Sequence, residues 1–152
     1  MLRDKIATAL PEAMKAKADK VRIATLRLMN AAIKDRDIAL RSQDHCCGVS
    51  DEEVLAVLTK MVRQREESSK TYEDAGRPAL AEQERSEIEV IREFMPRQLS
   101  EPEIEAAVDG VIENLGASGL KDMGKCMGAL KERYKGAMDF GRAGEMMKKR
   151  LA

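Results

Sequence analysis

Residues 121–135 read KDMGKCMGALKERYK, and this stretch decides that the C-terminal part of the chain is helical. Its larger apolar residues recur at steps of four, three and four, which predicts one apolar face of an α-helix. They are Met123, Met127, Leu130 and Tyr134. Gly124 and Gly128 fall on another face, because a helix turns by about 100° per residue. The cations around these two glycines are Lys121, Lys125, Lys131 and Lys135.

The two glycines require an explanation, because each glycine inside a helix costs roughly 0.5–1 kcal/mol relative to alanine. One interpretation is a surface that another backbone, such as a phosphate chain, approaches closely. The other is that the glycines let a neighbouring helix pack tightly while the lysines solvate the rim. The stretch by itself supports both interpretations equally.

The composition of the whole chain favours helices. Charged residues make up 36% of the 152 residues and aromatic residues only 3%, with ten methionines and no tryptophan. Abundant Ala, Glu, Lys, Leu and Arg favour helices, and few β-branched or aromatic runs are available for a sheet. A chain of this length forms one ordinary domain or two small lobes. We therefore predict an all-α protein with adaptable, methionine-containing cores.

Charge is strongly segregated along the chain, although the net charge is zero. Residues 1–41 and residues 117–152 each carry a net charge of +5, whereas residues 42–96 carry −6 and residues 97–116 carry −4. A polyanion would therefore contact the ends of the chain. Alternatively, the basic ends pair with the acidic middle, and the segregation is only structural.

Signals for export and membrane insertion are missing from the sequence. Charges at Arg3, Asp4 and Lys5 leave no visible secretory signal. No apolar run approaches the roughly 20 residues of a membrane span. Three cysteines without a framework spacing suit a reducing compartment. We expect a cytoplasmic protein without a membrane partner.

The residue pattern predicts seven helices in two lobes, a bundle of about four helices over residues 1–96 and a three-helix domain over residues 98–152. Pro11 should kink or restart the first helix, because its ring clashes with the preceding turn. The second helix is predicted to bury one face and to be strongly basic elsewhere. Its core residues are Leu26, Met29, Ile33 and Leu40, and its cations are Arg22, Arg27, Lys34, Arg36 and Arg41.

Local signals mark the helix ends. Two capping boxes, each a serine followed by a glutamate three residues later, predict helix starts. They are Ser50 with Glu53 and Ser100 with Glu103. Gly76 and Gly116 predict helix ends, and Pro78 fits the first turn of the next helix. Pro96 should stop the fourth helix, so Arg97-Gln98-Leu99 is the interdomain linker.

The side-chain pattern also predicts which helix faces are buried. The third helix carries a stripe that is apolar at both ends and polar in the middle, namely Val54, Leu58, Met61, Arg65, Ser68 and Tyr72. We interpret the acidic residues of the fourth helix as a solvated face, namely Glu82, Glu84, Glu87 and Glu89. The neighbouring pairs Glu84 with Arg85 and Glu89 with Arg92 are interpreted as weak surface pairs. Core positions of the fourth and last helices are Ile88, Ile91, Met95, Met146, Met147 and Leu151.

Segments spread over nearly the whole chain resemble the GatB/YqeY family, in particular its stand-alone YqeY-like members. In chain order they are residues 25–28 (TLRL), 31–34 (AAIK), 61–68 (MVRQREES), 72–77 (YEDAGR), 84–88 (ERSEI), 94–100 (FMPRQLS) and 122–125 (DMGK). The ordered series is specific, although each piece alone is weak. The chain departs from the family's usual pattern at Pro11 and in the loop around His45-Cys46-Cys47.

The resemblance implies a helical N-terminal bundle joined to a small domain similar to the tail of the B subunit of aminoacyl-tRNA amidotransferases. That tail helps to hold the tRNA whose misacylated glutamate or aspartate is amidated. The resemblance thus implies tRNA or another structured RNA as partner, with a protein of the translation or amidotransferase machinery as a further partner. Because of the homology, the family is grouped with carbon–nitrogen ligases that use glutamine as amido-N-donor.

The candidate nucleic-acid-binding residues follow from charge and position, and they are not recorded ligands of the family. They are Lys121, Gly124, Lys125, Gly128, Lys131 and Lys135. Of these, only Gly124 and Lys125 fall within residues 122–125, the part that matches the tail's signature.

Catalytic and metal-binding interpretations fail on the residues available. His45 is the only histidine, and its neighbours Cys46 and Cys47 cannot easily adopt triad geometry with it. Zinc sites generally space their cysteines by two to four residues, unlike Asp44-His45-Cys46-Cys47. Cys126 is interpreted as a small buried hydrophobe. Neither a Walker loop nor a dinucleotide fingerprint is present. We expect no catalytic residue, metal or cofactor.

Three classes of function therefore stand beside one another. The first is an RNA-binding accessory protein that contacts tRNA through its basic C-terminal lobe. The second is a protein–protein adaptor whose acidic helices over residues 51–96 dock onto a basic partner. The third is a component of a glutamine-dependent carbon–nitrogen ligase, with the chemistry supplied by a partner.

Overall fold

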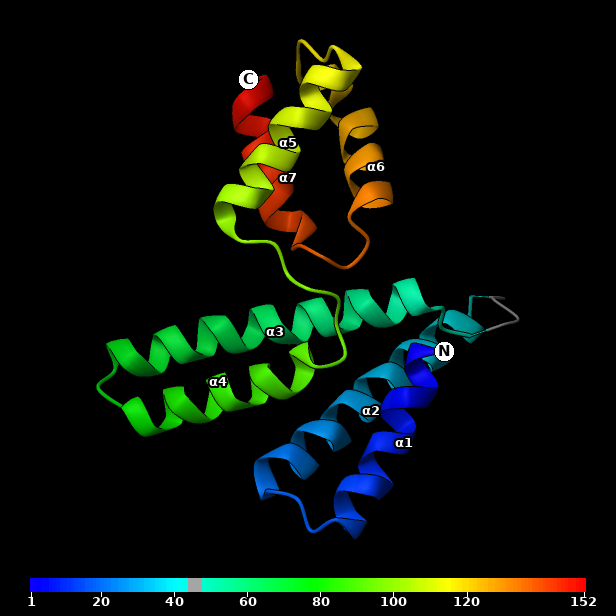
Figure 1. Ribbon diagram of the computed structural model, residues 1–152, viewed down its shortest axis with the longest axis vertical. Coiled ribbons are helices and arrows are strands. Elements are labelled where there is room, and N and C mark those ends of the chain that lie inside the picture. Colours follow the sequence, from blue (N-terminus) through cyan, green and yellow to red (C-terminus); the bar gives the residue numbers. More distant parts are fainter. Residues whose placement is uncertain (44–47) are drawn as a thin grey trace. The chain divides into compact units, whose positions relative to one another are not determined.

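The chain folds into helices throughout the residues that the structure describes, 1–43 and 48–152 of a computed structural model (Figure 1). This confirms the predicted all-α fold class. The helices divide into two compact units, Met1–Met95 and Pro96–Ala152. The first unit contains α1 (Leu2–Lys15), α2 (Lys20–Arg41), α3 (Asp51–Asp74) and α4 (Pro78–Arg92). The second contains α5 (Glu101–Leu115), the 3₁₀ turn η1 (Leu120–Asp122), α6 (Met123–Arg133) and α7 (Phe140–Leu151).

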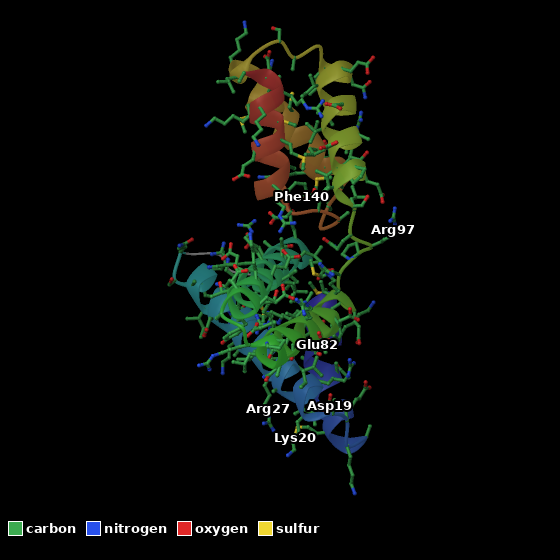
Figure 2. All side chains as sticks on the ribbon, turned by 90° about the vertical axis from the view of Figure 1, so that its left-hand side faces the viewer. Asp19, Lys20, Arg27, Glu82, Arg97 and Phe140 are labelled. Carbon is green, nitrogen blue, oxygen red and sulfur yellow. The ribbon has the colours of Figure 1, made fainter. Side chains whose placement is uncertain are left out.

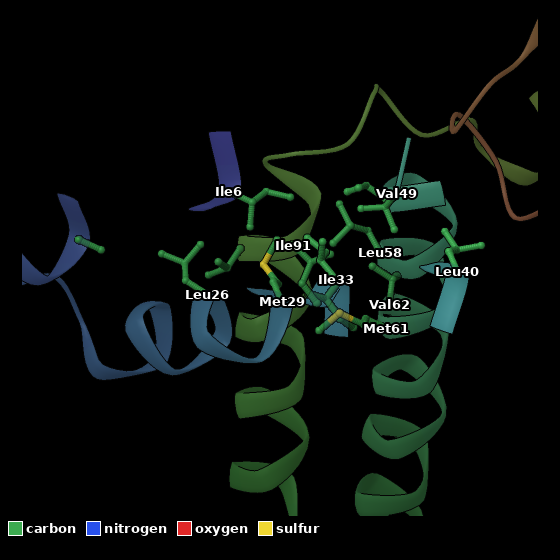
Figure 3. Close-up of a cluster of buried hydrophobic side chains, with 14 residues drawn as sticks. Ile6, Leu26, Met29, Ile33, Leu40, Val49, Leu58, Met61, Val62 and Ile91 are labelled. Carbon is green, nitrogen blue, oxygen red and sulfur yellow. The ribbon is translucent and has the colours of Figure 1, made fainter. Parts of the chain in front are cut away.

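The first unit consists of two helical hairpins that share one core. Helices α3 and α4 lie side by side, and α2 packs against both α1 and α4 (Figure 1). The predicted inner face of α2 is confirmed, because Leu26, Met29, Ile33 and Leu40 are buried. Figure 3 shows Met29 and Ile33 near Ile91 of α4 and Leu58 of α3, with Leu26 and Leu40 toward the two ends of the same cluster. Burial of each such side chain contributes roughly 1.5–3 kcal/mol.

Helix α1 runs without interruption through Pro11, so the predicted restart of this helix is wrong. Proline removes the hydrogen bond to the carbonyl four residues earlier, here that of Ala7. Both Ala7 and Pro11 are exposed, so water can solvate the freed carbonyl. Ile6 and Ala13 are buried on either side of the proline and hold both halves of the helix on the core.

The predicted helix ends are confirmed at both capping boxes. The Ser50 hydroxyl accepts a hydrogen bond from the Glu53 backbone N–H at 3.2 Å, and the Ser100 hydroxyl accepts one from the Glu103 N–H at 3.4 Å. Helix α5 ends at Gly116, whose φ of +59° is a left-handed conformation that glycine adopts without a steric penalty.

The α3–α4 hairpin is held together by ion pairs over its polar half, which corrects the interpretation of the α4 acids as a solvated face. Glu84 and Glu87 are half-buried, and Glu87 pairs with Arg65 across the two helices. The expected pairs within α4 are also replaced by other partners. Arg85 pairs with Glu73 and Glu82, and Arg92 pairs with Glu66. Glu82 and Glu89 are exposed, as expected.

The second unit has its own core, to which all three of its α-helices contribute. The buried residues are Ile104, Ala107, Val108, Val111, Cys126, Leu130, Met138, Ala143, Met147 and Leu151. Met146, predicted to point inward, is only half-buried. The segment that enters this unit is fixed by main-chain contacts: the Leu99 N–H donates to the Ala137 carbonyl at 2.8 Å, and the Gln98 amide donates to the Gly136 carbonyl at 2.7 Å.

Candidate nucleic-acid interface

Helix α6 presents both candidate glycines on its outer side. Its inner side is fixed by Cys126 and Leu130, each fully buried in the core of the second unit. Because Gly124 and Gly128 lie one helical turn apart and away from these anchors, they face solvent together, and both are exposed.

The helical part of this stretch is shorter than the sequence predicts. Helix α6 begins at Met123 and ends at Arg133, so Lys121 lies in the preceding η1 turn and Lys135 lies beyond the helix. Gly136, with a φ of +69°, turns the chain there and brings Met138 into the core. The structure therefore places four of the six candidate residues on one helix and the other two at its ends.

Both glycines are open within the second unit, so no other helix of this unit packs tightly against them. A Cβ atom built on Gly124 or Gly128 has no heavy atom within 4 Å. The glycine that does adjoin a helix in this unit is Gly144 of α7, where an added Cβ would lie 3.7 Å from Cε of Met127. The sequence pattern did not single out Gly144, because nothing local distinguishes it from an exposed glycine.

The lysines around the glycines carry uncompensated charge. All four, Lys121, Lys125, Lys131 and Lys135, are exposed. None has a carboxylate oxygen of the second unit, Pro96–Ala152, within 4.0 Å. Glu132 is the one acidic residue within α6, and the Asp122 carboxylate accepts a hydrogen bond from the Ser118 backbone N–H at 3.2 Å. We call these four lysines with Gly124 and Gly128 the α6 face.

The aromatic residues and the cysteine of this unit serve its core. Tyr134 and Phe140 are half-buried and pack against the core, which agrees with the place of Tyr134 on the predicted apolar face (Phe140 is labelled in Figure 2). Cys126 has no exposed surface, as expected for a small buried hydrophobe. Burial raises the pKa of the Cys126 thiol, and the negative charge of Asp122 raises it further.

The residues considered for catalysis give no second site in the described ranges. Asp44, His45, Cys46 and Cys47 lie outside the residues that the structure describes. Within residues 1–43 and 48–152, no group of three or more His, Cys, Asp or Glu side chains is arranged to hold a metal ion. Glu66 and Glu73 of α3 and Glu87 of α4 lie in ion pairs that join the two helices.

The protein–protein adaptor hypothesis requires carboxylates over residues 51–96 that are free to bind a basic partner. Six of the twelve acidic residues of this region are paired with arginines of the same unit. The pairs are Glu53 with Arg36, Glu66 with Arg92, Glu73 and Glu82 with Arg85, Glu87 with Arg65, and Glu93 with Arg22. A carboxylate that is already paired offers less to a basic partner, so the structure gives this alternative no specific support.

An exposed ion pair joins Arg97 of the linker to Glu103 at the start of α5. The Arg97 guanidinium binds both carboxylate oxygens of Glu103, at 2.7 and 3.4 Å (Arg97 is labelled in Figure 2). This hydrogen bond raises the pKa of Arg97, and together with that from the Ser100 hydroxyl it lowers the pKa of Glu103. The pair thus reinforces the capping box at the start of α5.

Comparisons with known proteins identify relatives of the chain. The family model described as "Yqey-like protein" matches residues 3–151. The chain is also similar to "Altered inheritance of mitochondria protein 41, mitochondrial" of Lachancea thermotolerans, with 34% identity over 112 residues. This alignment covers 72% of the chain and 57% of the relative, so the chain spans little more than half of that protein's length. No helix among the described residues is long and apolar enough to cross a membrane.

Proposed function

We propose, on the premise that this chain belongs to the family of Yqey-like proteins, that it is a non-catalytic accessory protein that binds structured RNA of the tRNA type. The α6 face is the proposed contact surface. The observation that carries the proposal is the combination of two open glycines with four exposed lysines that lack carboxylate partners within the second unit. The resemblance of the C-terminal half to the amidotransferase tail supports the same RNA class.

The open glycines supply access and the lysines supply attraction. Without a Cβ at Gly124 and Gly128, a sugar–phosphate backbone can approach the main chain of α6 more closely than it could at other residues. Lysine ammonium groups neutralise phosphates and release their counterions, which provides most of the affinity of sequence-independent binding. Structured RNA is recognised largely through its shape and its phosphates. This mode of binding does not require the aromatic platforms that this unit lacks on its described surface.

Retention of unmodified tRNA on nitrocellulose filters over a series of salt concentrations tests the proposal. Four phosphate contacts predict that log Kobs falls with log salt with a slope of about −3, since each contact contributes roughly 0.7–0.9. The Lys125→Glu/Lys131→Glu double variant should lose binding. The matched control is Lys60→Glu/Lys70→Glu, which changes the net charge equally at two exposed positions of α3. Binding that is absent at low salt, or equal in both variants, would contradict the proposal.

An amidation assay distinguishes the catalytic alternative from the proposed RNA-binding function. In that alternative, the chain contributes to a glutamine-dependent carbon–nitrogen ligase whose chemistry a partner subunit performs. We expect the isolated chain to form no Gln-tRNA from Glu-tRNA, ATP and ammonia, because no catalytic constellation is identified in its sequence. Formation of the amide by the isolated chain would overturn the non-catalytic assignment. The cytoplasmic location stays a prediction, and the name of the Lachancea relative places that protein in mitochondria.

A further inference from the structure

Helix α2 carries a row of cations on its outer side at intervals of seven residues. The row consists of Lys20, Arg27, Lys34 and Arg41, all of them exposed. At a rise of about 1.5 Å per residue, neighbouring members lie about 10.5 Å apart along the helix and the whole row extends about 31 Å. Arg41 pairs with Asp37 at 3.1 Å. The other three have no carboxylate partner in the part of the chain that the structure describes.

An exposed apolar strip runs beside this row. Ala24, Ala31 and Ile38 repeat with the same interval of seven, and Leu28 lies one turn after Ala24. One exposed carboxylate, that of Asp35, lies on the same side of the helix, one turn after Ala31. Ile38 is 57% exposed and Leu28 is 48% exposed, although α2 already buries a complete face in the core of the unit. Figure 2 shows the Lys20 and Arg27 side chains projecting outward from α2. We call the four cations together with Ala24, Leu28, Ala31 and Ile38 the α2 outer face.

We propose that the α2 outer face docks an acidic amphipathic helix of a partner protein. A second helix that crosses α2 at a shallow angle meets equivalent positions every seven residues, which matches the interval of both rows. Ala24 and Ala31 lack bulk, so a partner backbone can approach to the 8–10 Å typical of packed helices. The unpaired cations call for carboxylates along one edge of that helix, as at the flanking positions of coiled coils.

The apolar strip is what distinguishes a protein partner from RNA. Phosphate contacts need cations and access to them, which the lysines and open glycines of the α6 face offer. A single large apolar side chain, that of Leu120 at 50% exposure, lies beside this face, next to Lys121. Leu28 and Ile38 add nothing to a phosphate contact, whereas they contribute directly to helix docking by leaving water. The inference therefore goes beyond the proposed RNA contact and assigns the two activities to different helices.

A charge-exchange experiment with the full chain tests the proposal. The probe is a fluorescein-labelled synthetic helix of the length of α2, with leucine and alanine on one face and glutamate every seven residues beside them. Fluorescence anisotropy should show binding that weakens as salt is raised. The Arg27→Glu/Lys34→Glu variant should bind this peptide at least tenfold more weakly, and a peptide with lysine in place of glutamate should restore its binding. Leu28→Ser/Ile38→Ser should also weaken binding at least tenfold.

A charge-matched variant on α3 controls for the change in net charge of the α2 variant. Lys60→Glu/Lys70→Glu should bind the acidic peptide as the wild type does, and circular dichroism checks that each variant is folded. Failure of the wild-type chain to bind the peptide, or unchanged binding by Leu28→Ser/Ile38→Ser, overturns the proposal. Loss of tRNA binding or of self-association in Arg27→Glu/Lys34→Glu would assign the face to RNA or to a second copy instead. If Arg27→Glu/Lys34→Glu loses peptide binding but still binds tRNA, the α2 outer face and the α6 face have separate partners.

Discussion

The Nε atom of Arg65 on α3 lies 3.0 Å from Oε2 of Glu87 on α4, and both side chains are only 13% exposed. The same guanidinium donates through Nη1 to the Met61 carbonyl at 3.2 Å. Arg65 occupies the polar middle of the α3 stripe, where the apolar pattern of Val54, Leu58 and Met61 stops. Beyond the apolar core, a largely buried ion pair therefore takes the place of hydrophobic contacts in joining α3 to α4.

Removal of one member of this pair should destabilise the protein more than removal of both. We expect Glu87→Met or Arg65→Met to lower the free energy of unfolding by about 1–3 kcal/mol, because each leaves a largely buried charge unpaired. The double variant Arg65→Met/Glu87→Met should be less destabilised than either single variant, because it leaves no unpaired charge. Urea unfolding followed by circular dichroism measures all three. Additive losses would show that the two side chains do not interact in solution.

Glu84 should make the protein less stable as the pH rises. Burial, and then the neighbouring Glu87 carboxylate, raise the pKa of Glu84 above its ordinary value, while Arg65 acts in the opposite direction. Between the unfolded and the raised folded pKa, the folded state binds more protons, so the free energy of unfolding falls as pH increases. Glu84→Gln should therefore be more stable than the wild type at neutral pH.

The pH dependence supplies the control for this prediction. The advantage of Glu84→Gln should disappear below about pH 4, where the carboxyl is protonated in both states. Glu89→Gln, at an exposed position of the same helix, should show no comparable difference between the two pH values. Urea unfolding at neutral and acidic pH gives both comparisons. A Glu84→Gln variant that is less stable than the wild type at neutral pH would reverse the assigned sign.

Alanine at the open glycines should separate stability from RNA binding. Gly124→Ala and Gly128→Ala should each raise the free energy of unfolding by about 0.4–1 kcal/mol, because the added methyl meets no neighbour and restricts the unfolded chain. Both should weaken tRNA retention, since the methyl holds a phosphate away from the backbone. Gly110→Ala on α5 is equally open and serves as the control, with a similar gain in stability and unchanged tRNA binding. Unchanged binding in all three variants would leave the lysines as the only contacts.

Cys126 should be unreactive until the second unit opens. In a Cys46→Ser/Cys47→Ser variant it is the single thiol, and it is fully buried with a raised pKa. Modification by a disulfide reagent should be about a hundredfold or more slower than that of a free thiol, the factor imposed by an opening free energy of ~3 kcal/mol. Stopped-flow absorbance in native buffer and in urea measures the two rates. Rapid labelling in native buffer would show that the core of the second unit is open.

Features determined by neighbours in the chain could be predicted from the sequence. The capping serines Ser50 and Ser100 and the terminating Gly116 act within one helical turn, so local pattern is sufficient to place them. The buried face of α2 follows from its periodicity for the same reason. The lysines and glycines of the α6 face could likewise be chosen from spacing and charge.

Features determined by distant residues could not be predicted. Glu87 pairs with a residue 22 positions earlier, so its spacing within α4 suggested only a solvated face. The first helix continues through Pro11 because the core holds it on both sides of the proline. Helix α6 ends before Lys135 because Gly136 and Met138 redirect the chain toward the core. In each case a tertiary contact outweighed a local preference of a few kcal/mol at most.

The amino-acid order by itself determined that the chain is helical, where most of its helices begin and end, and which face of each helix is buried. Periodicity and capping are properties of a few consecutive residues and need no partner. Only the tertiary structure decided that Gly124 and Gly128 are open to solvent and that Leu28 and Ile38 stand exposed beside unpaired cations. Whether a surface is free depends on what the rest of the chain covers, and no local pattern contains that information.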